Sequence, residues 1–136
     1  MENMLRRLTV GLSTSSGATE ASLNDLRSAL GHQLPEEYLE LLRFSNGVEG
    51  SIAEGSYLVI WPAEEVVSLN EFNAVKDDAP DLLLFGSDSG STGYAFDTSS
   101  PGMPVVQVDL ILTDQRERIA SGFFDFLEKL AARQIT

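Results

Sequence analysis

Three short apolar segments in the second half of the chain are joined by turns that are too short to hold a helix. They are Leu82–Phe85, Gly93–Asp97 and Val105–Leu110, and residues 87–92 between the first two contain only Ser, Asp, Gly and Thr. Strands joined by such turns pair antiparallel, because a parallel neighbour requires a crossover of about a dozen residues or more. The sequence therefore predicts an antiparallel sheet built from these segments.

A further strand is predicted at Tyr57–Trp61, which is apolar at every position and is expected to be covered on both faces. Pro62 ends this strand and begins a helix, because its fixed φ suits a first helical position. The inward-facing positions of that helix are expected to be Val66, Leu69 and either Phe72 or Ala74.

A first helix is predicted to begin between Thr19 and Ser22 and to end at Gly31. Ser22 and Asp25 resemble a capping box, with aspartate in the place of glutamate. The positions that share the apolar face of this helix are Leu23, Leu26 and Leu30.

A second helix is predicted from Pro35 to Asn46-Gly47, with acidic residues in its first turn and Arg43 in its last. Its expected buried positions are Tyr38, Leu41 and Leu42. A last helix is predicted from about Ala120 to Ala132, with Asp125 and Lys129 paired one turn apart.

Helices at both chain ends with strands between them place the chain in the α+β class. Its 136 residues are expected to form a single domain, residues 1–136, because no linker-like stretch divides them. The chain has no cysteine and one histidine, His32, which excludes disulfides, thiolate zinc sites and paired histidine ligands. We therefore expect no metal and no cofactor.

The apolar stretch Leu8–Leu12 follows Arg6 and Arg7, but it is shorter than the apolar core of a secretory signal and is interrupted by Thr9 and Gly11. It is expected to form a short helix or an edge strand. Without an export signal, the expected compartment is the cytoplasm.

The net charge of −12 is unevenly distributed along the chain. Residues 36–97 carry −11 of it, with Arg43 and Lys76 as their only basic side chains. Such a segment either keeps the protein soluble or attracts a basic partner. It repels phosphate backbones and anionic membrane surfaces, so neither nucleic acid nor membrane is an expected partner.

The segment Gly86–Gly90 invites comparison with three kinds of site. A hydrolase nucleophile elbow needs a central serine, and this segment has Asp88 there. A phosphate-binding loop needs a lysine, and none lies between Lys76 and Lys129. A calcium loop of the EF-hand type beginning at Asp88 needs a glutamate twelfth, where the chain has Ser99. A hairpin turn is the favoured interpretation.

Two further groups of residues leave alternatives open. Paired carboxylates could perform acid–base chemistry, although the positive end of a helix dipole already explains Glu64 and Glu65. Trp61 is more often a core residue at such a position than an exposed binding anchor. His32 more often fills a helix–helix junction than binds a ligand.

Leu30-Gly31, Leu34-Pro35-Glu36-Glu37-Tyr38 and Asn46-Gly47 occur in a characteristic order and spacing. In this pattern the chain resembles the SUKH superfamily, of the fungal cell-wall-assembly-regulator type (Smi/Knr). One departure is Val48, where the family often has a second glycine.

The resemblance extends over about residues 19–130. Trp61 with the helix after it, the segments Leu84–Gly90 and Gly93–Asp97, and the terminal helix Phe123–Leu130 also look like the family. It implies an α+β domain without conserved catalytic machinery. Bacterial members of this type commonly act as immunity proteins that neutralise polymorphic toxins, often nucleases or deaminases, and other relatives serve as regulatory or scaffolding modules.

Our first hypothesis is a protein-binding module, an immunity protein whose acidic surface neutralises a basic toxin domain. The family does not fix the contact residues. Charge and turn position point to Glu49 and Glu54 in an expected loop, Asn46–Gly55, and to Asp88 and Asp97 in the hairpin of residues 86–97, with Trp61 as a partly exposed anchor. The second hypothesis is a regulator or scaffold that binds a basic or disordered partner. The third is an enzyme, which would require a pocket holding a carboxylate with a strongly shifted pKa.

Overall fold

The computed structural model describes residues 2–31, 33–72, 79–112 and 115–132. Within them, seven strands form one sheet in which each strand pairs antiparallel with the next strand of the chain. The strands are β1 Leu12–Thr14, β2 Val48–Ala53, β3 Ser56–Ile60, β4 Leu82–Ser87, β5 Thr92–Asp97, β6 Val105–Asp109 and β7 Arg116–Ala120. The predicted antiparallel sheet and the α+β class are confirmed.

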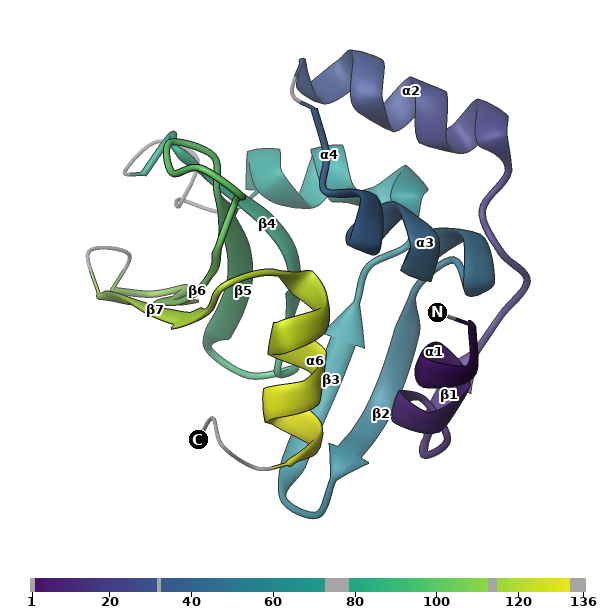
Figure 1. The fold of residues 1–136 in the computed structure, drawn as a ribbon. Helices are drawn as coiled ribbons and strands as arrows, with labels where there is room; N and C mark the ends of the chain where they lie inside the picture. Colours follow the sequence, from purple (N-terminus) through teal and green to yellow (C-terminus); the bar gives the residue numbers. More distant parts are fainter. Residues whose placement is uncertain (1, 32, 73–78, 113–114, 133–136) are drawn as a thin grey trace.

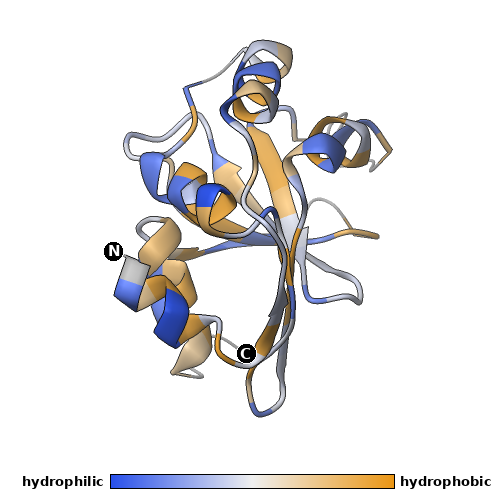
Figure 2. Ribbon diagram, turned by 90° about the vertical axis from the view of Figure 1, so that its right-hand side faces the viewer, coloured by the Kyte–Doolittle hydropathy of each residue, from blue (hydrophilic) through white to orange (hydrophobic). Residues whose placement is uncertain are grey.

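The helices lie mainly at the ends of the chain, and the last of them lies within the curve of the sheet (Figure 1). They are α1 Glu2–Leu8, α2 Glu20–Leu30, α3 Glu36–Phe44, α4 Ala63–Phe72 and α6 Phe123–Ala131. Because α6 contacts both β2 and β7, the sheet curls around this helix, while α4 packs on β4 and α2 packs on α4. Figure 2 shows hydrophobic and hydrophilic residues side by side in the helices, as expected where one helix face is buried.

An aromatic cluster joins the helices to the sheet. It consists of Tyr38 on α3, Phe85 on β4, Phe96 on β5, and Phe123 and Phe126 on α6, all fully buried. The rings of Phe85 and Phe96 stack with centroids 4.5 Å apart, and Tyr38 meets Phe96 edge-on at 5.2 Å. Each such pair contributes about 0.5–1.5 kcal/mol beyond the burial of its area. The predicted burial of Tyr38 is confirmed.

Where β4 extends beyond its short pairing with β3, an asparagine side chain takes the place of a neighbouring strand. Among the described residues, these two strands pair only near one end of β4, and α4 lies beside the remainder. The Leu84 N–H donates to Asn70 Oδ1, and Asn70 Nδ2 donates to the Leu84 carbonyl, both at 2.9 Å. The same nitrogen donates to the Val66 carbonyl at 2.8 Å. The buried amide of Asn70 therefore pairs the backbone of Leu84 as a neighbouring strand would.

The first predicted helix is confirmed, but its capping differs. Thr19 is the N-cap of α2, and its Oγ1 accepts from the Ser22 N–H at 3.1 Å. The proposed capping box of Ser22 and Asp25 is therefore wrong, because Ser22 already lies inside the helix. Gly31 ends α2 with a φ of 66°, as predicted.

Two strands were not expected from the sequence. β2 occupies residues that we expected to be a loop after Asn46, and β7 ends at Ala120, where the last helix was expected to begin. The helix α6 begins at Phe123 instead. Its predicted pair is confirmed, with Lys129 Nζ at 3.2 Å from Asp125 Oδ2.

One prediction of burial was wrong and another stays open. Of the two alternatives for an inward position of α4, Phe72 is 85% exposed, and Ala74 lies outside the described residues. The strand at Tyr57–Trp61 is not covered on both faces along its whole length: Leu58 and Ile60 are buried, but Val59 is only half-buried and Tyr57 is 39% exposed. None of the described helices has the length and apolar character needed to cross a membrane.

Candidate functional site

The Asn46-Gly47 pair fixes the start of α4 instead of serving only to end α3. Asn46 Oδ1 accepts from the Ala63 N–H, and Asn46 Nδ2 donates to Glu64 Oε1, both at 2.8 Å. Gly47 has a φ of +91°, and a Cβ there would lie 2.7 Å from the Ile60 carbonyl oxygen. Both residues are therefore required by the fold, and each amide atom of Asn46 already makes one hydrogen bond within the chain.

The segment around Tyr38 is likewise used within the molecule. Glu37 Oε1 accepts from the Phe124 N–H at 2.9 Å and so caps α6, whose own N-cap residue, Gly122, has no side chain to do so. Tyr38 lies in the aromatic cluster, where burial raises the pKa of its hydroxyl. Among the described residues nothing accepts from or donates to that hydroxyl.

Arg43 holds three carboxylates around the start of α2 and along α3. Its Nη1 lies 2.8 Å from Glu36 and 2.9 Å from Glu40, and its Nε lies 3.1 Å from Glu20. The hydrogen bond from Arg43 is the main cause that lowers the pKa of Glu20. Part of the negative charge of residues 36–97 is therefore neutralised inside this network.

Two of the acids predicted as partner contacts lie on the β2–β3 hairpin. Glu49 projects from the exposed face of β2 and accepts from the Tyr57 hydroxyl at 2.7 Å, which raises the pKa of Tyr57. Glu54 is exposed in the turn after β2, so about 13 Å of strand separates Glu49 from that turn. The structure thus places both acids in solvent but does not bring them together.

The other two predicted acids form turns at opposite ends of β5, a strand about 17 Å long. Asp88 Oδ1 accepts from the N–H groups of Gly90 and Thr92 at 2.8 and 3.2 Å and shapes the hairpin. Asp97 accepts from Ser99 and Ser100, and the hydrogen bond from Ser99 is the main cause that lowers its pKa. Whether either acid contacts a partner stays a prediction.

Trp61 is 8% exposed, so the preference for a core position is confirmed. The small exposed part lines an open hollow of about 330 Å³ between β1, the β2–β3 hairpin and the start of α4. We call it the Trp61 hollow. Residues that define it include Ser13, Asn46, Glu49, Trp61, Pro62 and Glu65.

The Trp61 hollow is acidic. Glu49 and Glu65 both line it and are exposed, and Glu64 lies at its edge through the bond to Asn46. That bond is the main cause that lowers the pKa of Glu64. Within the part of the chain that the structure describes, no basic side chain lies within 4 Å of these three carboxylates.

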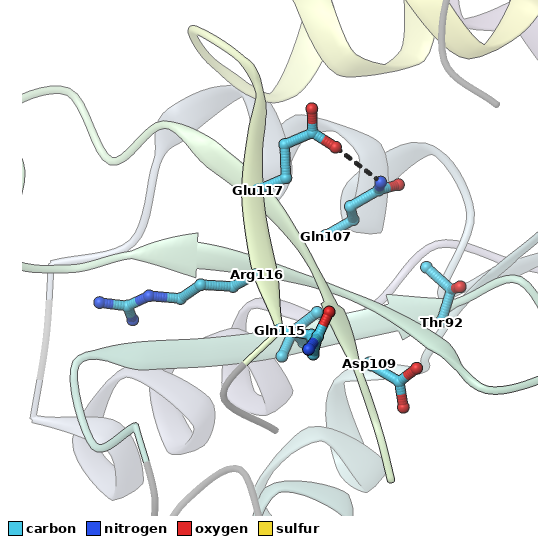
Figure 3. A pocket seen from close by; sticks show the side chains of 7 residues that line it. Thr92, Gln107, Asp109, Gln115, Arg116 and Glu117 are labelled. Atoms are coloured by element: carbon cyan, nitrogen blue, oxygen red, sulfur yellow. Dashed lines mark hydrogen bonds between the residues drawn. The ribbon is translucent and has the colours of Figure 1, made fainter. Parts of the chain in front are cut away.

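A second, polar hollow of about 250 Å³ lies at the β6–β7 hairpin (Figure 3). There Gln107 Nε2 donates to Glu117 Oε2 at 3.2 Å, and Arg116 extends away from both toward Asp81, also at 3.2 Å. Asp109 lies nearby, but its carboxylate accepts from the Ile111 and Leu112 N–H groups. Gln107, Glu117, Arg116 and Asp109 thus each have a hydrogen-bond or ion-pair partner, and no two of them form a nucleophile–base pair.

No grouping of His, Cys, Asp and Glu that could hold a metal ion occurs in residues 2–31, 33–72, 79–112 and 115–132. His32 lies outside these ranges. The sequence did not indicate that Glu65 and Asn46 lie near Trp61. Glu65 was explained by the helix dipole, and Asn46 was explained as the end of α3. The contacts between the hairpin and α4 that unite them have no local sequence signal.

The family model of the SMI1/KNR4 family (SUKH-1) matches residues 17–129. The chain belongs to this family. SUKH-1 roles include toxin immunity and cell-wall regulation, and its domains are generally non-catalytic. A comparison with curated proteins finds no match. The motif residues that carry the SUKH-1 resemblance, Glu37, Tyr38, Asn46 and Gly47, are those that cap helices and fill the core.

Proposed function

We propose that this SUKH-1 chain is a non-catalytic protein-binding module, an immunity protein that neutralises a toxin with a basic surface. One observation carries the proposal: Glu49, Glu64 and Glu65 gather around the Trp61 hollow and have no basic side chain within 4 Å among the described residues. An unbalanced acidic patch speeds association with a basic partner.

A nuclease toxin is a suitable partner on chemical grounds. Its cleft must be basic to bind a phosphate backbone, so an acidic surface can both attract it and block the cleft. The roles known for the family support this choice but equally include regulation. Glu54, Asp88 and Asp97 remain proposed contacts outside the Trp61 hollow, whereas Glu49 lines it.

The experiment uses the product of the gene adjacent to that of this chain. Both proteins are produced together, growth of the host is followed, and their affinity is measured by calorimetry at low and high salt. We expect protection of growth and an affinity that falls at least about tenfold as salt screens the charges. An affinity unchanged by salt would contradict the acidic surface. Binding without any protection would favour the regulator or scaffold.

A further inference from the structure

The Trp61 hollow contains a hydrogen-bond donor that the fold does not use. Trp61 is buried except for 8% of its surface, and no described group accepts from its indole N–H. Among the described residues, the polar side-chain atom that is both fully buried and without a partner is the Tyr38 hydroxyl. The Trp61 indole nitrogen also has no partner, so it is not fully buried and retains contact with solvent. Trp61 lines the hollow, and donation to a group that enters there requires that the indole N–H faces the hollow.

The acceptors of the same hollow are carboxylates. Glu49 has one oxygen occupied by the Tyr57 hydroxyl and a second that remains for a ligand. Glu65 lines the hollow with its side chain exposed on the first turn of α4. Asn46 is held in place by one hydrogen bond at each end of its amide, and it adds no charge to the hollow. A ligand that complements this set brings a positive charge to the carboxylates and an acceptor to the indole.

The remaining wall is mixed. Val59, Trp61 and Pro62 supply an apolar part, and Ser13, Thr14 and Ser15 supply a polar part. A guanidinium is flat, is more weakly hydrated than an ammonium, and packs well against aromatic and apolar groups while donating several hydrogen bonds. The volume of about 330 Å³ lies at the small end of the roughly 300–1,000 Å³ typical of ligand pockets. It suits one long side chain better than a whole cofactor.

We propose that the Trp61 hollow receives an arginine of a protein partner. The guanidinium lies at Glu49 and Glu65, and a backbone carbonyl of the same segment accepts from the Trp61 indole N–H. This inference rests on the proposed function, because it names the part of the acidic surface that recognises the partner and the residue type that is recognised.

The test uses the single tryptophan of the chain, which gives one indole signal in a ¹⁵N-labelled sample. A five-residue blocked peptide with one central arginine is added at low salt, beside the same peptide with citrulline, which has the shape of arginine without its charge. We expect the arginine peptide to move the indole signal and the amide signals of residues 46–49. The Glu49→Gln/Glu65→Gln variant is expected to weaken the binding about three- to tenfold.

The single variants Glu49→Gln and Glu65→Gln have a matched control in Glu117→Gln, which removes one charge on β7, at the opposite edge of the sheet order from β1 and β2. Binding by this control is expected to stay within about twofold of the original. Equal binding of the citrulline peptide, an unmoved indole signal, or an equal loss in Glu117→Gln would overturn the inference. If the partner of the co-production experiment binds Glu49→Gln/Glu65→Gln as tightly as the original chain, the arginine site is wrong while the proposed function stands.

Discussion

Replacing Asn70 by alanine tests whether one side chain substitutes for a strand at the gap between β3 and β4. The substitution removes the partners of the Leu84 N–H and carbonyl, both now paired at 2.9 Å, and Leu84 is fully buried. Leaving a buried backbone group unpaired costs about 1–3 kcal/mol. Two such groups, less about 0.5 kcal/mol from the better helix propensity of alanine, give a loss of about 1.5–5.5 kcal/mol.

The assay is denaturant unfolding, with amide hydrogen exchange of Leu84 as a local measurement. Domains of this kind unfold with about 5–15 kcal/mol, so the expected loss is a large share and is readily measured. The control is Ser68→Ala on the same helix, where an exposed hydroxyl donates to the Glu65 carbonyl and the change is expected to stay within about 0.5 kcal/mol. A loss below about 1 kcal/mol in Asn70→Ala, with the Leu84 amide still protected, would refute the strand-substitution argument.

Three further predictions concern caps, the core and pH. Asn46→Ala removes the cap of α4 and is expected to lower the free energy of unfolding by about 1–2 kcal/mol, measured against an exposed control, Asn24→Ala. Tyr38→Phe deletes a buried hydroxyl without a partner among the described residues, so chemical denaturation should show unchanged or higher stability; a loss above about 1 kcal/mol would disagree. Burial raises the pKa of Tyr94 to about 12, above the unfolded value of about 10. The stability that neutral Tyr94 contributes is therefore complete below about pH 10 and is lost by about 1.4 kcal/mol per pH unit as the pH rises toward 12. Because the pKa values of Tyr38 and Tyr57 are raised as well, the measurement is the difference in unfolding between the original chain and Tyr94→Phe at alkaline pH; a difference that does not change with pH would contradict the prediction.

The parts of the fold that the sequence predicted have strong local signals. α2 and α3 combine apolar periodicity with end signals at Gly31 and Pro35, and β4 is a continuous apolar run. β7 reads Arg-Glu-Arg-Ile-Ala and is mostly exposed, so no alternation of apolar and polar residues marks it, and its extended form comes from pairing with β6. β2 contains Gly50 at a φ of 146°, a residue that ordinarily indicates a turn.

The candidate site was only partly predictable, because tertiary contacts and not a local sequence pattern bring its residues together. Charge and turn position identified Glu49, and the proline after Trp61 located the start of α4. The proximity of Glu49, Trp61 and Glu65 arises from the junction of the hairpin with α4, and side-chain contacts such as that of Asn46 with Ala63 create it. Asp88 and Asp97 look like surface charges in the sequence, although each is held by hydrogen bonds in its own turn.

The position of α6 also determines how the chain can fold while it is being synthesised. Every strand pairs with the one made just before it, so the ribosome delivers the strands in the order in which they are used. The cap from Glu37 to Phe124 spans 87 residues, and Phe123 and Phe126 complete the aromatic cluster. Until α6 emerges, the nascent sheet therefore carries an uncovered aromatic surface, a state that chaperones bind and that aggregates readily. Folding of this domain is completed in one late step, when its last helix arrives.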